Sequence, residues 1–489
     1  MPGKKAHDLH ERSRLLADES IGKLLFKLSA PATIGMLVQA LYNLVDTVFV
    51  GQALGESSVQ GIAGIAVAFP IMMIVMAIAL AIGIGGASII SRSLGERNID
   101  RAENVMGNVL SLVLITSAVI CIAGSIFITP ILRLFGATDT ILPYATEYLS
   151  VILYGAIFFM FALAMNNVVR AEGNAKVAMY TMLVSALVNI ILDPFFIFNS
   201  GYIEFNFLAD KLGIVIEPLY MYGFGLGVKG AAIATVLAQV TGALFIVWYF
   251  ASGNSSLRFH TKNLMPKWDI ARESISIGMG PLARNASSSL MVIVLNNVLL
   301  VYGGGDVAIA VFGVVNRLFM FTFMPMYGII QGLQPIVGFN YGAKNFSRVI
   351  ESVKLSMFVT TTMAILGFIL LLVFPEQLFS IFTTDQQLIS SGKYATRIMV
   401  MALPLVGFQV VGASLYQAIG KARPSFLLAM SRQLLFLIPL VIILPHFFQL
   451  TGVWMAFPLS DSLAFLLTFV MVIKELRILT IMGENITSS

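Results

Sequence analysis

Apolar residues occur along this chain in long blocks that polar, charged segments separate. Twelve of these blocks reach about 20 residues, the length that a helix needs to cross the hydrocarbon core of a bilayer. The apolar stretches cover approximately 29–50, 61–89, 105–128, 143–168, 177–198, 227–250, 275–301, 307–333, 355–374, 392–418, 424–445 and 452–473. Only helices and closed barrels satisfy their backbone hydrogen bonds in lipid. The pattern therefore predicts an all-α membrane protein with twelve transmembrane helices.

The composition agrees with this pattern. Of the 489 residues, 58% are hydrophobic and only 11% are charged, whereas a soluble domain has about 25% charged residues. So few charges exclude a cytosolic enzyme, a nucleic-acid-binding protein and a disordered scaffold, and make membrane lipid the expected surroundings. The one cysteine, Cys121, lies in an apolar stretch, so no disulfide framework is expected.

The basic residues indicate which side each connection occupies, because cytoplasmic loops carry an excess of Lys and Arg. The N-terminal segment and every second connection are basic. These residues are Lys4, Lys5, Arg12, Arg14, Lys23, Lys27, Arg92, Arg97, Arg101, Arg170, Lys176, Arg258, Lys262, Lys267, Arg272, Lys344, Arg348, Lys354, Lys421, Arg423, Lys474 and Arg477. The alternate connections hold Arg133 and Lys211. Both termini are predicted to be cytosolic, and the polar N-terminus is not typical of a cleaved signal peptide.

The two halves of the chain resemble each other. SLGERNIDRAENV near residue 95 aligns with NYGAKNFSRVIESV, and RAEGNAK (170–176) aligns with QAIGKAR (417–423), both at a shift of 247 positions. Parallel repeats of this kind are related by an axis along the membrane normal. We predict an N-lobe at 29–250, a cytosolic linker at 251–274 and a C-lobe at 275–473, with cytosolic tails at 1–28 and 474–489. Two six-helix lobes suit alternating access, which favours a transporter.

The sequence contains no nucleotide-binding motif. The Gly-Lys pairs lack the glycine and the Ser or Thr of a phosphate-binding loop, so transport is expected to use an ion gradient and no cofactor. HDLHE near the N-terminus is not the HExxH zinc motif. No metal site is predicted beyond a possible Na⁺ site.

Charged residues inside apolar stretches are costly and point to function. They are Asp46 and Asp193 in the N-lobe, and Arg284, Arg317, Arg432 and Asp461 in the C-lobe. We expect charge pairing among the four C-lobe residues, with Asp461 neutralised by one of the arginines. Arginines that instead face a cavity would favour anionic or zwitterionic substrates.

Asp46 and Asp193 each lie about five residues from the outer end of their stretch, at a shared depth of ~7 Å. Asn189 precedes Asp193 by four residues, on the same helix face, and Thr235 lies ~12 Å below the outer surface. These four residues form the predicted ion-coupling site, with Gln39 and Tyr42 on the helix face of Asp46. Carboxylates with amide and hydroxyl oxygens suit H⁺ and Na⁺ alike, although a purely structural role for both aspartates stays open.

Several segments resemble the multidrug and toxic compound extrusion (MATE) family. They are LYNLVDTVFVG (41–51), RAEGN (170–174), NIILDPFFIF (189–198) and QGLQPIVGFNYGAKN (331–345). The aspartates in LVDTVFVG and LDPFFIF favour the DinF-like branch with its MepA-type exporters. The NorM-like branch instead has a glutamate in its seventh span, where this chain has Arg284 and no acid.

This resemblance implies an antiporter that expels organic cations in exchange for H⁺ or Na⁺. We expect it to be a monomer in a prokaryotic plasma membrane, although the sequence does not determine the oligomeric state. It places the family's ion site on Asp46, Asn189, Asp193 and Thr235. The substrate-binding positions fall on Gln39, Tyr42, Asn166 and Met182, and Pro31 marks a bend in the first span. The long outer connection at 199–226 departs from the family pattern and is interpreted as a cap or entry loop.

Three other functions compete with export. A flippase of the same superfamily for lipid-linked substrates would need a basic cavity, which the C-lobe arginines supply weakly. A membrane enzyme is disfavoured because no catalytic His pair or Ser/His pair lies within a span. A passive channel is disfavoured because the buried acids are concentrated in one lobe.

Overall fold

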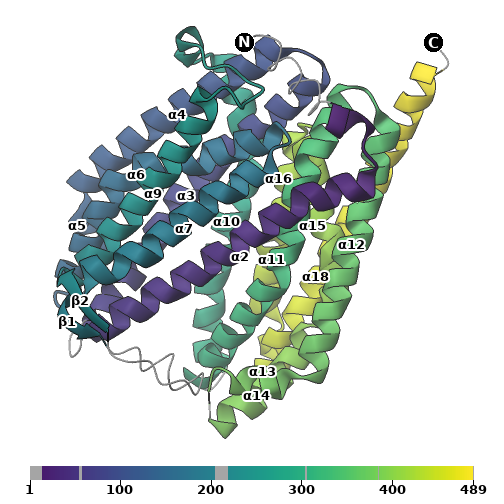
Figure 1. Ribbon diagram of the computed structural model, residues 1–489. Helices are drawn as coiled ribbons and strands as arrows, with labels where there is room; N and C mark the ends of the chain where they lie inside the picture. The colour runs from purple at the N-terminus through teal and green to yellow at the C-terminus, as the bar shows by residue number, and fades with distance from the viewer. Residues whose placement is uncertain (1–13, 54–57, 204–218, 303–305, 384, 488–489) are drawn as a thin grey trace.

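The computed structural model describes residues 14–53, 58–203, 219–302, 306–383 and 385–487, and these are almost entirely helical. The N-lobe contains α2 (Ile21–Ala53), α3 (Ser58–Gly95), α4 (Ile99–Ile126), α5 (Ile128–Leu134), α6 (Leu142–Ala171), α7 (Ala175–Ile197), β1 (Asn199–Ile203), β2 (Leu219–Phe224) and α9 (Gly227–Ala251). The C-lobe contains α10 (Trp268–Tyr302), α11 (Asp306–Gly342), α12 (Phe346–Val373), α13 (Pro375–Ser380), α14 (Gln386–Met399), α15 (Leu403–Ala418), α16 (Ala422–Met430), a π-helical turn (Ser431–Leu437), α17 (Ile438–Ile443) and α18 (Pro445–Thr487). The two lobes lie side by side in Figure 1.

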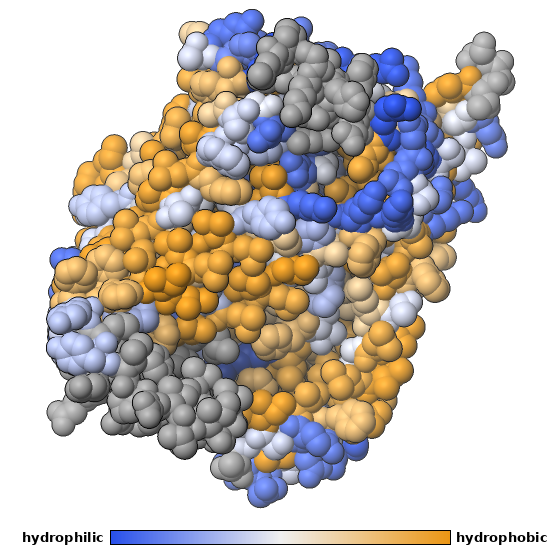
Figure 2. All heavy atoms as spheres, viewed as in Figure 1, coloured by the Kyte–Doolittle hydropathy of each residue, from blue (hydrophilic) through white to orange (hydrophobic). Residues whose placement is uncertain are grey.

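Within the described residues, eleven helices are long and apolar enough to cross a membrane, and a bent pair brings the number to twelve. The bent pair is α14 and α15, between which the helix axis bends by 55°. The sequence predicts one continuous span over 392–418 at this place. Pro404 at the start of α15 explains the bend, because proline has no N–H to continue the helical hydrogen bonds. In Figure 2 apolar side chains cover the middle of the bundle, and polar side chains gather at the end that holds both chain termini.

Three helices extend beyond the boundaries predicted for the lobes. Helix α2 begins at Ile21, α10 begins at Trp268 and α18 continues to Thr487, so parts of the predicted tails and linker are helical. The hydropathy pattern underestimates these helices because their ends are polar and project past the apolar block. The strands β1 and β2 pair antiparallel within the long connection, whose central residues 204–218 lie outside the described residues.

The backbone repeats itself where the sequence does. Arg97 and Lys344, which are 247 positions apart, both adopt left-handed conformations, with φ of 59° and 58°. Gly173 and Gly420 form a second pair at the same shift, with φ of 81° and 82°. We call the end of the bundle that holds these turns and both chain termini the basic end, and the opposite end, with β1 and β2, the hairpin end (Figure 1).

The lobes pack against each other near the basic end. Gly332 of α11 abuts Ser29 of α2, and Gly278 of α10 abuts the carbonyl of Ala81 of α3, so that a Cβ on either glycine would overlap its neighbour. Ser88 of α3 also donates a hydrogen bond to the carbonyl of Gln417 at 2.7 Å. All of these contacts come from the halves of the helices nearest the basic end, which is therefore closed between the lobes.

Charged groups join the lobes at the same end. Arg92 and Arg101 donate to the carboxylate of Glu273, at 2.9 and 3.0 Å. Arg348, the repeat counterpart of Arg101, donates to the carbonyl of Glu19 at 2.7 Å. The N-lobe arginines thus bind the start of α10, the first helix of the C-lobe, and Arg348 of the C-lobe binds the segment just before α2.

Candidate functional site

The two N-lobe aspartates lie on adjacent helices at the same depth. Gly35 of α2 contacts Met182 of α7, and both helices run from the basic end toward the hairpin end. Asp46 follows Gly35 by eleven residues, and Asp193 follows Met182 by eleven. Because both helices rise by about 1.5 Å per residue, this equal spacing brings the carboxylates level. Each carboxylate lies within electrostatic range of the other.

The oxygens of this site are only partly satisfied. The Asn189 amide donates to one oxygen of the buried Asp193 carboxylate at 2.9 Å. The other oxygen of Asp193, one oxygen of Asp46 and the amide oxygen of Asn189 are buried and have no donor among the residues that the structure describes. Three unpaired acceptors in one buried site favour a proton or a cation as their partner, since a buried polar group without one is costly.

Thr235 approaches this site from α9. Gly242 of α9 abuts Ser185 of α7, and Gly230 abuts Phe196, so the two helices are antiparallel. These two contacts put Thr235 at about the level of Ile191 and Leu192, within one helical turn of Asp193 along α7. Thr235 is buried, and its hydroxyl can supply a further oxygen at this depth.

Sequence reasoning missed Tyr148. This residue of α6 is buried and lies within electrostatic range of both Asp46 and Asp193, as Tyr42 does. The spacing of residues in the sequence could not reveal this role, because Tyr148 looks like any other aromatic residue of an apolar helix. Only the packing of α6 brings it near Asp46 and Asp193. Leu149, the next residue, lines an apolar pocket between α3, α6 and α9 and belongs to the same hydrophobic cluster as Phe49 and Ile197, which lie one helical turn beyond the two aspartates.

The four predicted substrate-binding residues fall at two different depths. Gln39 and Tyr42 lie on α2 within two turns of Asp46. Asn166 and Met182 lie nearer the basic end. The Asn166 amide donates to the carbonyl of Ala178 at 2.8 Å, which ties α6 to α7 in this conformation.

The C-lobe charges have three different surroundings. Arg432, in the π-helical turn, donates to Asp461 of α18 at 2.6 Å and lies over the ring of Phe323 at 5.1 Å. Arg284 lies over the ring of Tyr327 at 5.6 Å. Arg317 is exposed on α11. The structure thus brings Arg432 and Asp461 together and leaves the other two arginines apart from them.

A bundle of membrane-spanning helices in two similar lobes, with unpaired carboxylate oxygens buried inside one of them, is the architecture of a membrane transporter. Comparison with known proteins gives the family. The MatE family model matches residues 31–195 and 283–443. The chain belongs to the MatE family of multidrug transporters, as the sequence motifs predicted, and is a transporter rather than an enzyme.

Similar proteins cover nearly the whole chain. The multidrug export protein MepA of Staphylococcus haemolyticus (strain JCSC1435) is 26% identical over 93% of this chain and 94% of its own length. The solved structure of the MATE multidrug transporter DinF-BH in complex with a dye is 45% identical, with a TM-score of 0.81, over 94% of this chain and 96% of that one. An outward-facing MATE transporter of the MOP superfamily is 28% identical, with a TM-score of 0.83, over 96% of this chain and 98% of that one. These matches confirm the predicted DinF-like, MepA-type resemblance and the two-lobe helical fold.

Proposed function

We propose that this protein exports amphipathic organic cations in exchange for H⁺ or Na⁺, by alternating access of its two lobes. The observation that carries the proposal is the buried set of unpaired oxygens on Asp46, Asn189 and Asp193. A proton or Na⁺ bound there would neutralise two carboxylates that repel each other, and an organic cation could compete for the same charge. Binding of one then displaces the other.

The surroundings support an amphipathic substrate. The apolar pocket beside Tyr148 includes Met72, Leu149 and Phe159, and thioether and aromatic groups suit flat apolar molecules of varied shape. The relatives are named for multidrug export, and DinF-BH was solved with a bound dye. In this proposal the basic end faces the cytosol, as the Lys and Arg distribution predicts, and the structure with its closed basic end is an outward-facing state.

Gradient-driven transport tests the proposal. Liposomes that contain the purified protein are loaded with a fluorescent organic cation such as rhodamine 6G. Movement of the dye is measured first under an imposed pH gradient and then, in a separate experiment, under an imposed Na⁺ gradient. We expect one gradient to drive the dye and Asp46→Asn and Asp193→Asn each to abolish that movement. Asp139→Asn is the matched control, because Asp139 is an exposed carboxylate paired with Arg133.

Two results would contradict the proposal. Normal coupled export by both N-lobe variants would remove the ion site from Asp46 and Asp193. The absence of dye movement under either gradient would favour the flippase alternative, and labelled lipids would then be the substrates to test.

A further inference from the structure

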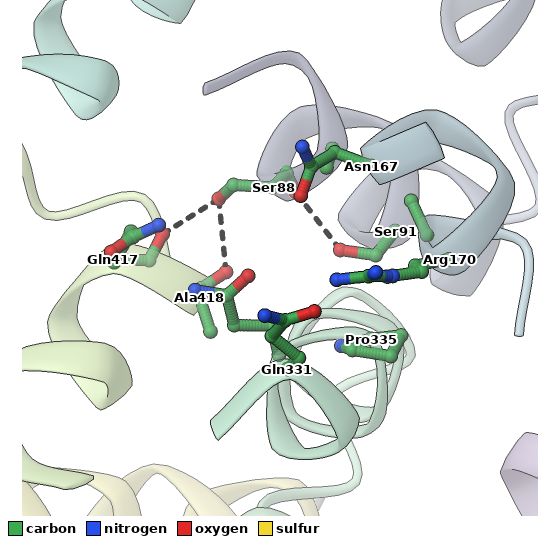
Figure 3. Close-up of a pocket in the computed structure, with 11 residues that line it drawn as sticks. Ser88, Ser91, Asn167, Arg170, Gln331, Pro335, Gln417 and Ala418 are labelled. Carbon is green, nitrogen blue, oxygen red and sulfur yellow. Dashed lines mark hydrogen bonds between the residues drawn. The ribbon is translucent and has the colours of Figure 1, made fainter. Parts of the chain in front are cut away.

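A polar pocket lies between the lobes near the basic end, away from the carboxylate site. Helices α3 and α6 of the N-lobe and α11 and α15 of the C-lobe form its walls (Figure 3). Its lining includes residues at equivalent positions of the repeat, 247 apart: Ser88 with Pro335, Arg170 with Gln417, and Ala171 with Ala418. The pocket therefore lies on the pseudo-two-fold axis of the molecule.

Arg170 gives this pocket a positive charge on one side of the axis. By its position in the sequence Arg170 is one of the basic residues of the connections, but the structure buries it at the end of α6 with 9% of its surface exposed. In the part of the chain that the structure describes, its Nε has no hydrogen-bond partner, and one terminal nitrogen lies 3.4 Å from the sulfur of Met182. Among the described residues, no carboxylate lies within ion-pairing distance of Arg170.

Two glutamines place further unsatisfied groups in the same pocket. The Nε2 of Gln417 and the Oε1 of Gln331 are buried and have no partner within the described ranges, while Nε2 of Gln331 contacts the sulfur of Met36 at 3.1 Å. An amide can exchange its O and N positions by rotation, so Gln331 can also present a donor. Figure 3 shows Arg170 extending into the pocket from the N-lobe, with Gln331 and Gln417 on the C-lobe side.

The charge of Arg170 determines which kind of ligand would satisfy the unpaired groups of Arg170, Gln331 and Gln417. A water molecule would satisfy the hydrogen bonds but would leave the buried guanidinium without a counter-charge, which is costly at low dielectric. A carboxylate or phosphate group supplies both the hydrogen-bond acceptors and the negative charge, and the planar guanidinium, with its forked N–H groups, matches the geometry of such an oxyanion.

The size of the pocket depends on the distance between the lobes. In this lobe-closed structure the pocket is about large enough for one water molecule. Its walls belong to both repeats, so separation of the lobes at the basic end enlarges it. An acidic group can therefore enter when the basic end is open, and closure of the lobes leaves it no room.

We propose that Arg170, with Gln331 and Gln417, binds the acidic group of zwitterionic amphiphiles that enter from the basic end. Closure of the lobes at that end then expels this group and favours its release toward the hairpin end. This inference rests on the proposed export function and extends its substrate class from cations to zwitterions with a carboxylate or phosphate.

Two dyes of the same ring system test the proposal. Rhodamine 6G is an ester and carries only positive charge, whereas rhodamine 19 is its free carboxylic acid. We expect Arg170→Gln to weaken the binding of rhodamine 19 at least ten-fold more than that of rhodamine 6G, measured by fluorescence anisotropy on the purified protein. Arg170→Lys, which keeps the charge, should recover part of this difference, and Arg258→Gln is a control because Arg258 is exposed in the linker.

A second variant and a free anion complete the experiment. Gln417→Leu changes the C-lobe wall alone and should weaken rhodamine 19 selectively, by several-fold. Competition of inorganic phosphate with rhodamine 19 at constant ionic strength would show that free anions also bind the pocket. Lack of competition would show that the pocket binds an acidic group only as part of the substrate.

An unchanged ratio of the two dye affinities in both variants would overturn the proposal. An equal loss of both dyes would also overturn it, because it would show a structural role for Arg170. Binding is measured without a gradient, so failure of the ion-coupled export function would not affect this result.

Discussion

The guanidinium of Arg101 donates a hydrogen bond to the carboxylate of Glu273 at 3.0 Å, across the boundary between the two lobes. Arg92 shares the same carboxylate. Both pairs lie at the closed end of the molecule, and both would have to break for the lobes to separate there. The repeat counterpart of Arg101, Arg348, binds main-chain carbonyls of the other lobe instead.

Glu273→Gln is expected to shift the lobes toward the state that is open at the basic end. Partly exposed ion pairs contribute ~0.2–1 kcal/mol each, so loss of both pairs should change the ratio of closed to open molecules by about five-fold. Spin labels on Asp100→Cys and Ser347→Cys, in a Cys121→Ser background, would report the distance between lobes. Glu376→Gln is the control, because it removes an exposed pair with Lys393 within the C-lobe. A distance distribution unchanged by Glu273→Gln would show that the pairs of Glu273 with Arg92 and Arg101 do not hold the lobes together.

The close approach of α2 and α11 depends on Gly332. A methyl group there would overlap the Ser29 hydroxyl and stand 2.8 Å from its backbone nitrogen, so Gly332→Ala should force the lobes apart at the basic end. Gly313→Ala on the same helix has open space around its Cβ and should stabilise α11 by roughly 0.5–1 kcal/mol. Thermal unfolding in detergent and the same spin-label distances would compare the two variants; similar behaviour of both would exclude the steric explanation.

The hydrogen bond from Asn189 orients Asp193. Asn189→Ala removes the one side-chain donor that the structure shows on that carboxylate. Hydrogen bonds to charged groups are worth ~1.5–3 kcal/mol, so we expect at least a ten-fold fall in gradient-driven dye transport, with the protein still folded. Asn297→Ala should transport normally, since that amide bonds within its own helix and is exposed. Full activity of Asn189→Ala would show that the carboxylates act without this partner.

The buried pair of Arg432 and Asp461 should be more sensitive to loss of one partner than to loss of both. Asp461→Asn leaves the Arg432 charge uncompensated. Breaking a fully buried pair in this way costs ~3–5 kcal/mol, and the cost here is expected to be smaller because 23% of the Arg432 side chain is exposed. The double variant Arg432→Met with Asp461→Leu should recover most of that stability. Apparent Tm values of the unaltered protein, Asp461→Asn and the double variant in detergent would test this order of stability. Equal values for Asp461→Asn and the unaltered protein would show that the pair does not stabilise the C-lobe.

The sequence alone determined the features that depend on consecutive residues. Apolar block length predicts the spans, the alternation of basic connections predicts their sides, and the 247-position repeat predicts two similar lobes, which the matched left-handed turns at Arg97 and Lys344 show in the backbone. The motifs around Asp46 and Asp193 also predicted the family correctly.

Only the tertiary structure decided which residues from distant helices meet. The spacing within α2 and α7 gives each aspartate a depth, but the contact of Gly35 with Met182 brings the two to the same level. Tyr148 beside them, and Arg170 on the axis opposite Gln417, could not be inferred from their neighbours in sequence. The rotation of each helix about its own axis, which sets whether a side chain faces lipid, the lobe interior or the other lobe, is fixed by packing rather than by local composition.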